Sequence, residues 1–231
     1  MKTSLCPVPA ILAAVVFSAA TASAGLGAPP QTVEPDLAAL VDGKGGTLVN
    51  RSITRIDKEG RPAIRFDERP DHGFARIDDL TFGDGVIEFD ARGQNVPQRS
   101  FLGLAFHGAD DATYDAIYFR PFNFKAEDPA RRRRAVQYIS LPTHTWQQLR
   151  GQFPGKYENA VAPVPDPEGW FHVRVVIAAP RVSVFVNDAA EPCLVVEQLS
   201  TRRRGWIALW VDVSGGDFAN LRLTPREEGN E

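Results

Sequence analysis

Three consecutive pieces of the chain decide the fold: FGDGVIEFDARG (residues 82–93), SFLGLAFHGADDATYDAIYFRPFNF (residues 100–124) and RRRRAVQYIS (residues 131–140). Each piece alternates between two kinds of side chain. In the second piece Leu102, Leu104 and Phe106 take every other position, and a different set that ends with His107 lies between them. A period of two predicts β-strands whose alternate side chains face opposite ways, one way into the dry interior of a sandwich.

The opposite face of these strands carries an unusual set of residues: Glu88, Asp90, His107, Tyr118, Arg120 and Gln137. Such a face is either a solvated exterior or the floor of a binding cleft. We expect all of these side chains to lie on one surface.

The rest of the chain repeats the strand pattern. It predicts about eleven short strands at regular spacing, which is typical of an antiparallel sandwich. Two hairpins are predicted among them, one of residues 48–57 with 63–66 and one of residues 170–177 with 182–187. The stretch THTWQQLRGQ (residues 143–152) is the one convincing helix, with Thr143 or Thr145 as its N-cap. We therefore predict an all-β fold, an antiparallel two-sheet jelly-roll sandwich with one short helix.

The N-terminus has the pattern of a secretory signal peptide. Lys2 precedes an apolar run at residues 11–17, and the small residues 22–24 form a cleavage site. The apolar run is too short for a membrane span. We predict cleavage after Ala24 and a secreted or periplasmic protein. The predicted divisions are a signal peptide at 1–24, a flexible leader at 25–35, a single jelly-roll domain at 36–225 and a polar tail at 226–231.

Charge and cysteine content restrict the class of protein. The net charge of −3 argues against nucleic acid or an anionic membrane as the main partner. The run at residues 131–134 is the basic exception, and we interpret it as a solvated turn rather than an anion site. Signal cleavage removes Cys6 and leaves Cys193, which we expect to be a buried free thiol.

The order of several motifs resembles a known superfamily: FLGLAFH (101–107), YDAIYFRPFN (114–123), AVQYIS (135–140), HVRVVI (172–177), RGWIALWV (204–211) and GDFANL (216–221). They resemble secreted bacterial domains of the concanavalin-A-like lectin/glucanase superfamily, most closely the 3-keto-disaccharide hydrolase-like family, over residues 82–223. The resemblance implies a two-sheet jelly roll whose concave sheet meets a carbohydrate or glycoside. Enzymes and pure binders share this fold, so it implies no single activity.

One motif departs from the glucanases of this superfamily. Glu88 and Asp90 supply E-x-D, but Arg92 stands where the third carboxylate is expected. Retaining hydrolysis uses two carboxyl groups about 5–5.5 Å apart. Glu88 and Asp90 thus either contact the substrate or belong to a solvated strand face.

Two functional hypotheses follow. A hydrolase acting on a 3-keto glycoside requires one base and one cation that stabilises the oxyanion, for which we select His107 or Glu158 and Arg120. A binding module needs only contacts to the sugar. In both hypotheses the candidate substrate-binding residues are Tyr118, Asn123, Gln137, Trp146, Arg150, Glu88 and Asp90.

Some roles stay open at this stage. Trp146 either stacks on a sugar or pins the helix to the sandwich, and Glu158 is expected on a lid. Trp170, Trp206 and Trp210 are expected to fill the core. We expect no metal and no cofactor, although Asp110 with Asp111, and Asp212 with Asp217, offer oxygens of the kind that calcium binds.

Overall fold

The computed structural model describes residues 1 and 31–226. The predicted cleavage point at Ala24 and nearly all of the predicted tail lie outside the described residues. None of the helices in the described part is long and apolar enough to cross a membrane.

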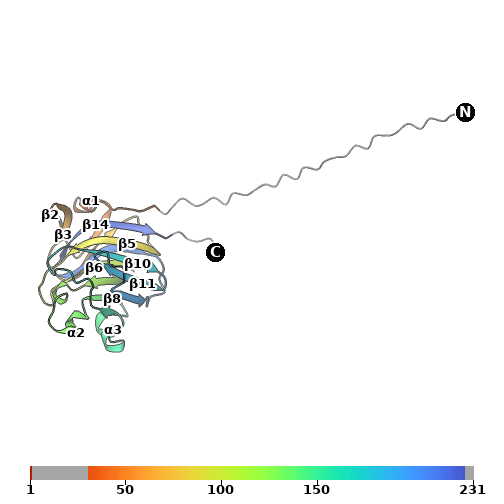
Figure 1. The fold of residues 1–231 in the computed structure, drawn as a ribbon. Coiled ribbons are helices and arrows are strands. Elements are labelled where there is room, and N and C mark those ends of the chain that lie inside the picture. The colour runs from red at the N-terminus through yellow and green to blue at the C-terminus, as the bar shows by residue number, and fades with distance from the viewer. Residues whose placement is uncertain (2–30, 227–231) are drawn as a thin grey trace.

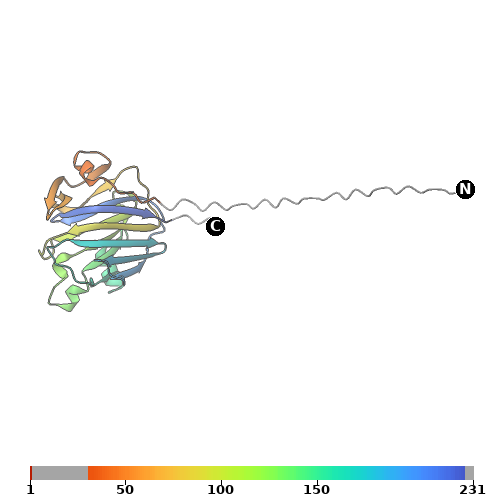
Figure 2. The same cartoon turned by 45° about the horizontal axis from the view of Figure 1, so that its top comes forward.

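Within the described residues, fourteen strands form two antiparallel sheets of seven strands each, and the two sheets pack as layers (Figures 1 and 2). The sheet that we call the front sheet, which lies behind the other one in the view of Figure 2, has, in spatial order, β1 (Gly46–Val49), β4 (Arg69–Ile77), β13 (Trp206–Val213), β6 (Ser100–Asp110), β7 (Thr113–Phe119), β8 (Val136–Ser140) and β9 (Glu158–Asn159). The back sheet has, in spatial order, β12 (Leu194–Glu197), β11 (Arg181–Val186), β10 (Phe171–Ala178), β5 (Gly85–Arg92), β14 (Gly216–Pro225), β3 (Arg61–Phe66) and β2 (Ile53–Lys58). The predicted all-β two-sheet sandwich is confirmed.

The core lies between the sheets and follows from the alternation in the strands. Strand β10 alternates strictly between buried and half-buried residues, as a strand with one dry face must. The rings of Phe119 and Phe171 meet edge-on at 5.3 Å and join β7 of the front sheet to β10 of the back sheet. Cys193 is buried as predicted, and burial raises the pKa of its thiol to about 12.

Three short helices and one 3₁₀ turn occur among the described residues, rather than one helix: α1 (Leu37–Val41), η1 (Pro121–Asn123), α2 (Pro129–Arg132) and α3 (Trp146–Gln152). Helices α2 and α3 lie at the opposite end of the molecule from α1 (Figure 1). A capping box between Thr145 and Gln148 starts α3, and its buried Leu149 anchors it.

The two predicted hairpins are confirmed, as β2 with β3 and β10 with β11. The number of strands is larger than predicted, because short strands such as β1 and β9 have too few residues to show alternation. Part of the basic run forms α2 instead of a turn, because Asp128 caps it and Pro129 begins it.

Candidate functional site

The outer face of the front sheet presents a row of residues that crosses neighbouring strands. Residues opposite one another in an antiparallel pair project on the same face. The register aligns one residue each from β4, β13, β6, β7, β8 and β9: Phe74, Trp210, Gly103, Tyr118, Gln137 and Glu158. The predicted common face of Tyr118 and Gln137 is correct, and Glu158 joins them from the edge strand.

Gly103 lets the aromatic rings of this row meet. The ring centroids of Tyr118 and Trp210 are 5.1 Å apart, although β6 lies between their strands. A Cβ atom on residue 103 would lie 2.1 Å from the carbonyl oxygen of Ile117. Glycine is therefore required by space, and the two rings form one continuous aromatic surface.

A second row lies two residues further along β7 and β13. His72 of β4 pairs with Asp212 of β13, which pairs with Phe101 of β6. Arg120 directly follows β7 and extends the row. Its backbone amide donates to the carbonyl of Ala135 at 2.7 Å, and its guanidinium carbon lies 5.7 Å from the centre of the Phe101 ring.

A groove of about 800 Å³ lies over these rows, which is within the range of about 300–1,000 Å³ for ligand sites. Tyr118 and Trp210 line its floor. Helix α3 contributes Trp146 and Arg150 to the lining, and the segment after β7 contributes Arg120, Phe122, Asn123, Arg131 and Arg134. Five of the predicted site residues, Tyr118, Arg120, Asn123, Trp146 and Arg150, are thus brought together.

Arg120 is nearly buried, with 5% of its surface exposed. Its guanidinium donates to the Arg134 carbonyl at 2.9 Å, to the Tyr118 hydroxyl at 2.8 Å and to the Gln137 amide oxygen at 3.2 Å. Burial lowers the pKa of Arg120, yet a guanidinium stays charged at neutral pH. The groove therefore contains a fixed, desolvated cation held by uncharged groups.

The Tyr118 hydroxyl is prepared to donate a hydrogen bond. Burial raises the pKa of Tyr118 to about 12, so the hydroxyl is protonated at neutral pH. Because its oxygen already accepts from Arg120, its own proton is available to another acceptor. A phenol and a guanidinium side by side suit the hydroxyl and ring oxygens of a sugar.

Glu158 lies in strand β9 and not on a lid, so that expectation is wrong. Its carboxylate accepts from Arg150 Nη2 at 2.6 Å and from Arg150 Nε at 3.0 Å, and Arg134 Nε is 3.8 Å away. Only 7% of Glu158 is exposed. It holds Arg150 against the groove and is itself occupied by that arginine.

Trp146 is 41% exposed at the rim of the groove. The guanidinium of Arg150 lies 4.8 Å from the ring centre. Since Leu149 anchors the helix, the indole is not needed as a pin. This arrangement favours the stacking role for Trp146.

His72 and Asp212 line the groove, and the sequence analysis did not select them as catalytic or substrate-binding. His72 is exposed and stacks on Trp210 at 6.0 Å. Partial burial lowers the pKa of His72 and raises the pKa of Asp212. The alternation in WIALWVDV (206–213), where Trp210 and Asp212 share a parity, was the signal that could have identified Asp212.

His107 does not line the groove, so its expected place there is wrong. The pairing of β6 with β7 shifts register between Phe106 and Asp110, and His107 takes a positive φ of 50°. Such a bulge re-aims a side chain. His107 is fully buried, where its Nδ1 lies 2.8 Å from Gln198 Nε2, and burial lowers its pKa.

Glu88 and Asp90 do not share a face with Tyr118, so the prediction of one polar face is wrong for them. Strand β5 belongs to the back sheet, so these carboxylates project from the other side of the sandwich. Asp90 lies 2.9 Å from His172 Nδ1 and 2.9 Å from Arg61 Nη1, and it accepts from Asn220 at 2.6 Å.

Tryptophan placement also differs from the expected core positions. Trp170 and Trp206 are only half-buried. Trp206 stacks on Phe74 at 5.1 Å on the outer face of the front sheet, and Trp210 is buried there rather than between the sheets. On this face Trp206 packs against Phe74 and Trp210 lines the groove.

The candidate calcium ligands do not gather. Asp217 binds Arg65 at 2.7 Å and Arg92 at 3.2 Å, and Asp111 lies 3.7 Å from Arg76. Within residues 31–226, no group of three or more His, Cys, Asp or Glu side chains is placed to hold a metal ion.

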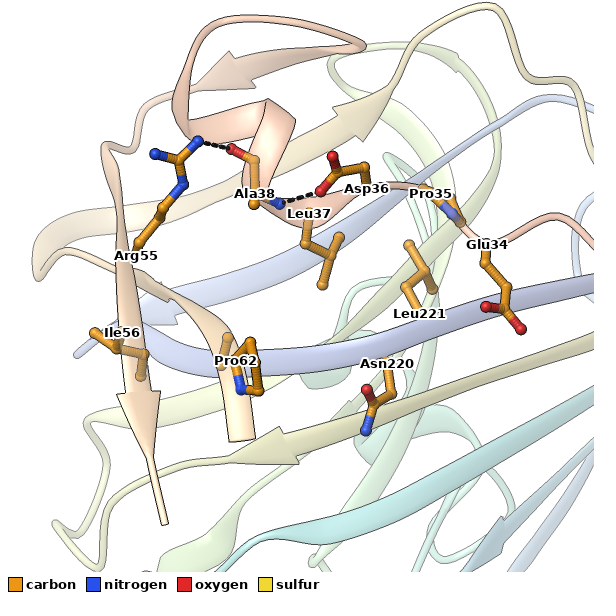
Figure 3. Close-up of a pocket in the computed structure, with 11 residues that line it drawn as sticks. Glu34, Pro35, Asp36, Leu37, Ala38, Arg55, Ile56, Pro62, Asn220 and Leu221 are labelled. Atoms are coloured by element: carbon orange, nitrogen blue, oxygen red, sulfur yellow. Dashed lines mark hydrogen bonds between the residues drawn. The ribbon is translucent and has the colours of Figure 1, made fainter. Parts of the chain in front are cut away.

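A second hollow, of about 350 Å³, lies between the segment around α1 and the back sheet (Figure 3). Arg55 crosses toward α1 and donates to the Ala38 carbonyl at 3.0 Å, and Asp36 accepts from the amides of Ala38 and Ala39. These polar groups already serve to attach and cap α1. The groove on the front sheet is the better candidate site.

Solved structures with a similar fold are known. The chain is similar to the carbohydrate-binding module CBM66 from Bacillus subtilis (TM-score 0.51, 14% identity, 78% of this chain and 96% of that one). It is also similar to a Bacillus subtilis protein of unknown function with a galectin-like fold (TM-score 0.52, 13% identity, 84% of this chain and 96% of that one). A third similar structure is domain 4 of AbnA, a GH43 extracellular arabinanase from Geobacillus stearothermophilus, in complex with arabinotriose (TM-score 0.50, 12% identity, 78% of this chain and 82% of that one).

No protein-family model matches the chain, and no curated protein matches it in sequence. At these identities the structural similarity supports the fold alone. It agrees with the sandwich that the concanavalin-A-like resemblance implies.

Proposed function

We propose that this protein is an exported domain that binds carbohydrate in the groove of the front sheet. The observation that carries the proposal is the groove itself, where an exposed Trp146 stands at the rim above Tyr118, Trp210 and Arg120. Sugar rings have apolar C–H faces that pack on aromatic rings and hydroxyls that need donors. By their names, two proteins of similar fold bind carbohydrate, which supports the proposal.

Trp146 offers the sharpest test, because an exposed residue can be removed without disturbing the core. We expect Trp146→Ala to weaken binding to a glycan identified on an array by about tenfold, which is about 1.4 kcal/mol. Phe153→Ala is the matched control, since Phe153 is 39% exposed and follows the same helix without lining the groove. Failure of the folded wild type to bind any glycan, or equal loss in both variants, would contradict the proposal.

Cleavage of a 3-keto glycoside, as in the hydrolase-like family that the sequence resembles, is the second candidate. It is favoured by the titratable pair His72 and Asp212 in the same groove as Arg120. One of the pair removes the proton on the carbon beside the ketone, and the enolate oxygen that forms is stabilised by Arg120. The enolate then expels the aglycone from the anomeric carbon, and the aglycone oxygen takes the proton that the base had removed. Water then adds across the double bond, with its hydroxyl on the anomeric carbon and its proton on the neighbouring carbon.

This candidate requires product release from a 3-keto disaccharide such as 3-keto-trehalose. We expect His72→Gln or Asp212→Asn to abolish release while glycan binding persists. If the wild type binds but releases nothing, binding alone is the function. If both variants keep full activity, the base lies elsewhere.

Export and independence from metal are parts of the same proposal. Edman sequencing of the mature protein is expected to begin at Gly25, and a mature chain that begins at Met1 would contradict export. Glycan binding is expected to be unchanged in EDTA, and its loss would indicate a calcium ion.

A further inference from the structure

The guanidinium groups around the groove outnumber the carboxylates. Four arginines line it, Arg120, Arg131, Arg134 and Arg150, and Asp212 is its one carboxylate. Glu158 lies behind Arg150 and is shared between Arg150 and Arg134. Two arginines come from the basic run that the sequence analysis interpreted as a solvated turn.

Arg120 is the most deeply buried of these four arginines. All three of its side-chain hydrogen-bond partners are uncharged. Arg150 and Arg134 add positive charge nearby, and the carboxylate that acts on it, Glu158, is already bound to Arg150. A buried charge with no opposite charge in hydrogen-bond contact is costly. Stacking over the Tyr118 ring at 4.8 Å offsets part of that cost.

The other buried arginine, Arg51, is in different surroundings. Its guanidinium also donates to backbone carbonyls, but the carboxylates of Asp67, Asp71 and Asp212 act on it and raise its pKa against the larger effect of burial. It does not line the groove. Three carboxylates therefore act on Arg51, whereas the lining of the groove has four arginines and one carboxylate.

Arg131 also lacks a charged partner. It reaches the Asn123 side-chain oxygen and the Phe122 carbonyl, both at 3.4 Å, so its partners are distant and uncharged. Helix α2 presents Arg131 and the turn after it presents Arg134, while Arg133 between them is exposed and does not line the groove.

We infer that the groove selects an acidic carbohydrate, one whose sugar units bear an anionic group that Arg120, Arg131 and Arg134 bind. This inference rests on the proposed carbohydrate binding and names its ligand class. Planar guanidinium groups form paired hydrogen bonds with carboxylates and with other oxyanions. The aromatic floor packs on the sugar ring while the arginines take its charge.

Matched oligosaccharides test the inference by calorimetry at low salt. The probes are cellotetraose, the β-1,4-linked tetraglucuronate that differs only in oxidation at C6, and 6-sulfated cellotetraose. We expect an acidic probe to bind at least about tenfold tighter than cellotetraose, with the advantage reduced by salt. The two acidic probes distinguish a carboxylate from a sulfate ester. A parallel set on a mannan backbone covers the other common stereochemistry.

Single-charge variants show whether the groove is responsible. Arg131→Gln and Arg134→Gln are expected to reduce the affinity for the acidic probes several-fold more than the affinity for the neutral probe. Arg133→Gln removes the same charge outside the groove and is expected to leave the advantage intact. Equal loss in all three variants would overturn the inference, because a general electrostatic effect would then suffice.

The outcomes separate the two proposals. Equal affinity for neutral and acidic members overturns the acidic preference and leaves carbohydrate binding standing. Binding of malonate as tight as that of the tetraglucuronate, without binding of any neutral sugar, overturns both, since the groove would then be a plain anion site. No binding of any probe to the folded protein likewise overturns both.

Discussion

Arg120 on the front sheet and Asp90 on the back sheet are both charged and nearly buried, with 5% and 6% exposure. Their surroundings differ. Asp90 has His172, Arg61 and Asn220 within 2.9 Å, so its charge is balanced inside the protein. Arg120 has only uncharged hydrogen-bond partners and faces a groove.

These two residues show how a structural charge differs from a functional one. A buried ion with opposite charges and hydrogen bonds around it is satisfied by the fold. A buried ion that faces a groove and has no opposite charge in hydrogen-bond contact attracts a ligand of opposite charge. On the outer face of the back sheet the charge of Asp90 is paired within the protein. On the outer face of the front sheet Arg120 has no charged hydrogen-bond partner.

The largest effect on stability is expected from Asp90→Ala. It should reduce the free energy of unfolding by about 2–3 kcal/mol, less than the 3–5 for a fully buried pair, because His172 and Arg61 keep access to water. Urea denaturation measures it. Glycan affinity should not change, and a loss of affinity would mean that the two faces are coupled.

Arg120→Met should have a small effect on stability and a large effect on the binding of acidic sugars. Removing an uncompensated cation should change the free energy of unfolding by at most about 1 kcal/mol, yet abolish the preference for acidic sugars. The same urea titration and calorimetry check both. The comparison breaks down if this variant is destabilised as much as Asp90→Ala.

The pH dependence of stability should differ between the two faces. The hydrogen bond to Asp90 raises the pKa of His172, so its contribution is complete below the unfolded pKa of about 6.5 and is lost as pH rises above that value. His172→Gln should remove this loss of stability above about pH 6.5. Unchanged pH dependence in the variant would contradict the assigned pairing.

His72 should act with the opposite sign. Partial burial lowers the pKa of His72, so the unfolded chain binds the proton more readily and stability falls as pH drops below about 6.5. His72→Gln should make the protein less sensitive to mild acid. Thermal unfolding at pH 5 and pH 7 checks this, and equal sensitivity in the two proteins would contradict it.

The smallest effect on stability is expected from Trp146→Ala. An exposed aromatic that makes no core contact should contribute within about 0.5 kcal/mol to unfolding. Thermal denaturation next to Phe153→Ala measures the difference. A large loss would restore the role of Trp146 as a pin for α3.

Much of the fold could be predicted from local pattern. The pattern in residues 170–177 and 182–187 predicted a hairpin, which the structure contains as β10 with β11. The cap at Thr145 and the buried Cys193 also follow from local chemistry. Within the site, the shared parity of Tyr118 and Arg120 correctly placed both on one surface.

Other site residues could not be placed from local pattern. Alternation tells which side chains of a strand share a face, but it says nothing about which sheet the strand joins. Glu88 therefore appeared to share a face with Tyr118, although β5 pairs with β10 and β14 in the back sheet. His107 was misplaced because a bulge reverses parity without an evident sequence signal.

Local sequence accounts for the strands, for the buried face of each strand, for helix α3 and for the presence of arginines and aromatic residues. Which of these side chains meet depends on the tertiary structure. Pairing between distant strands aligned Trp210, Gly103 and Tyr118, and the chain after β7 brought the arginines of the basic run to Arg120. The physical reason is that a groove and its charge balance depend on long-range contacts, which no local period encodes.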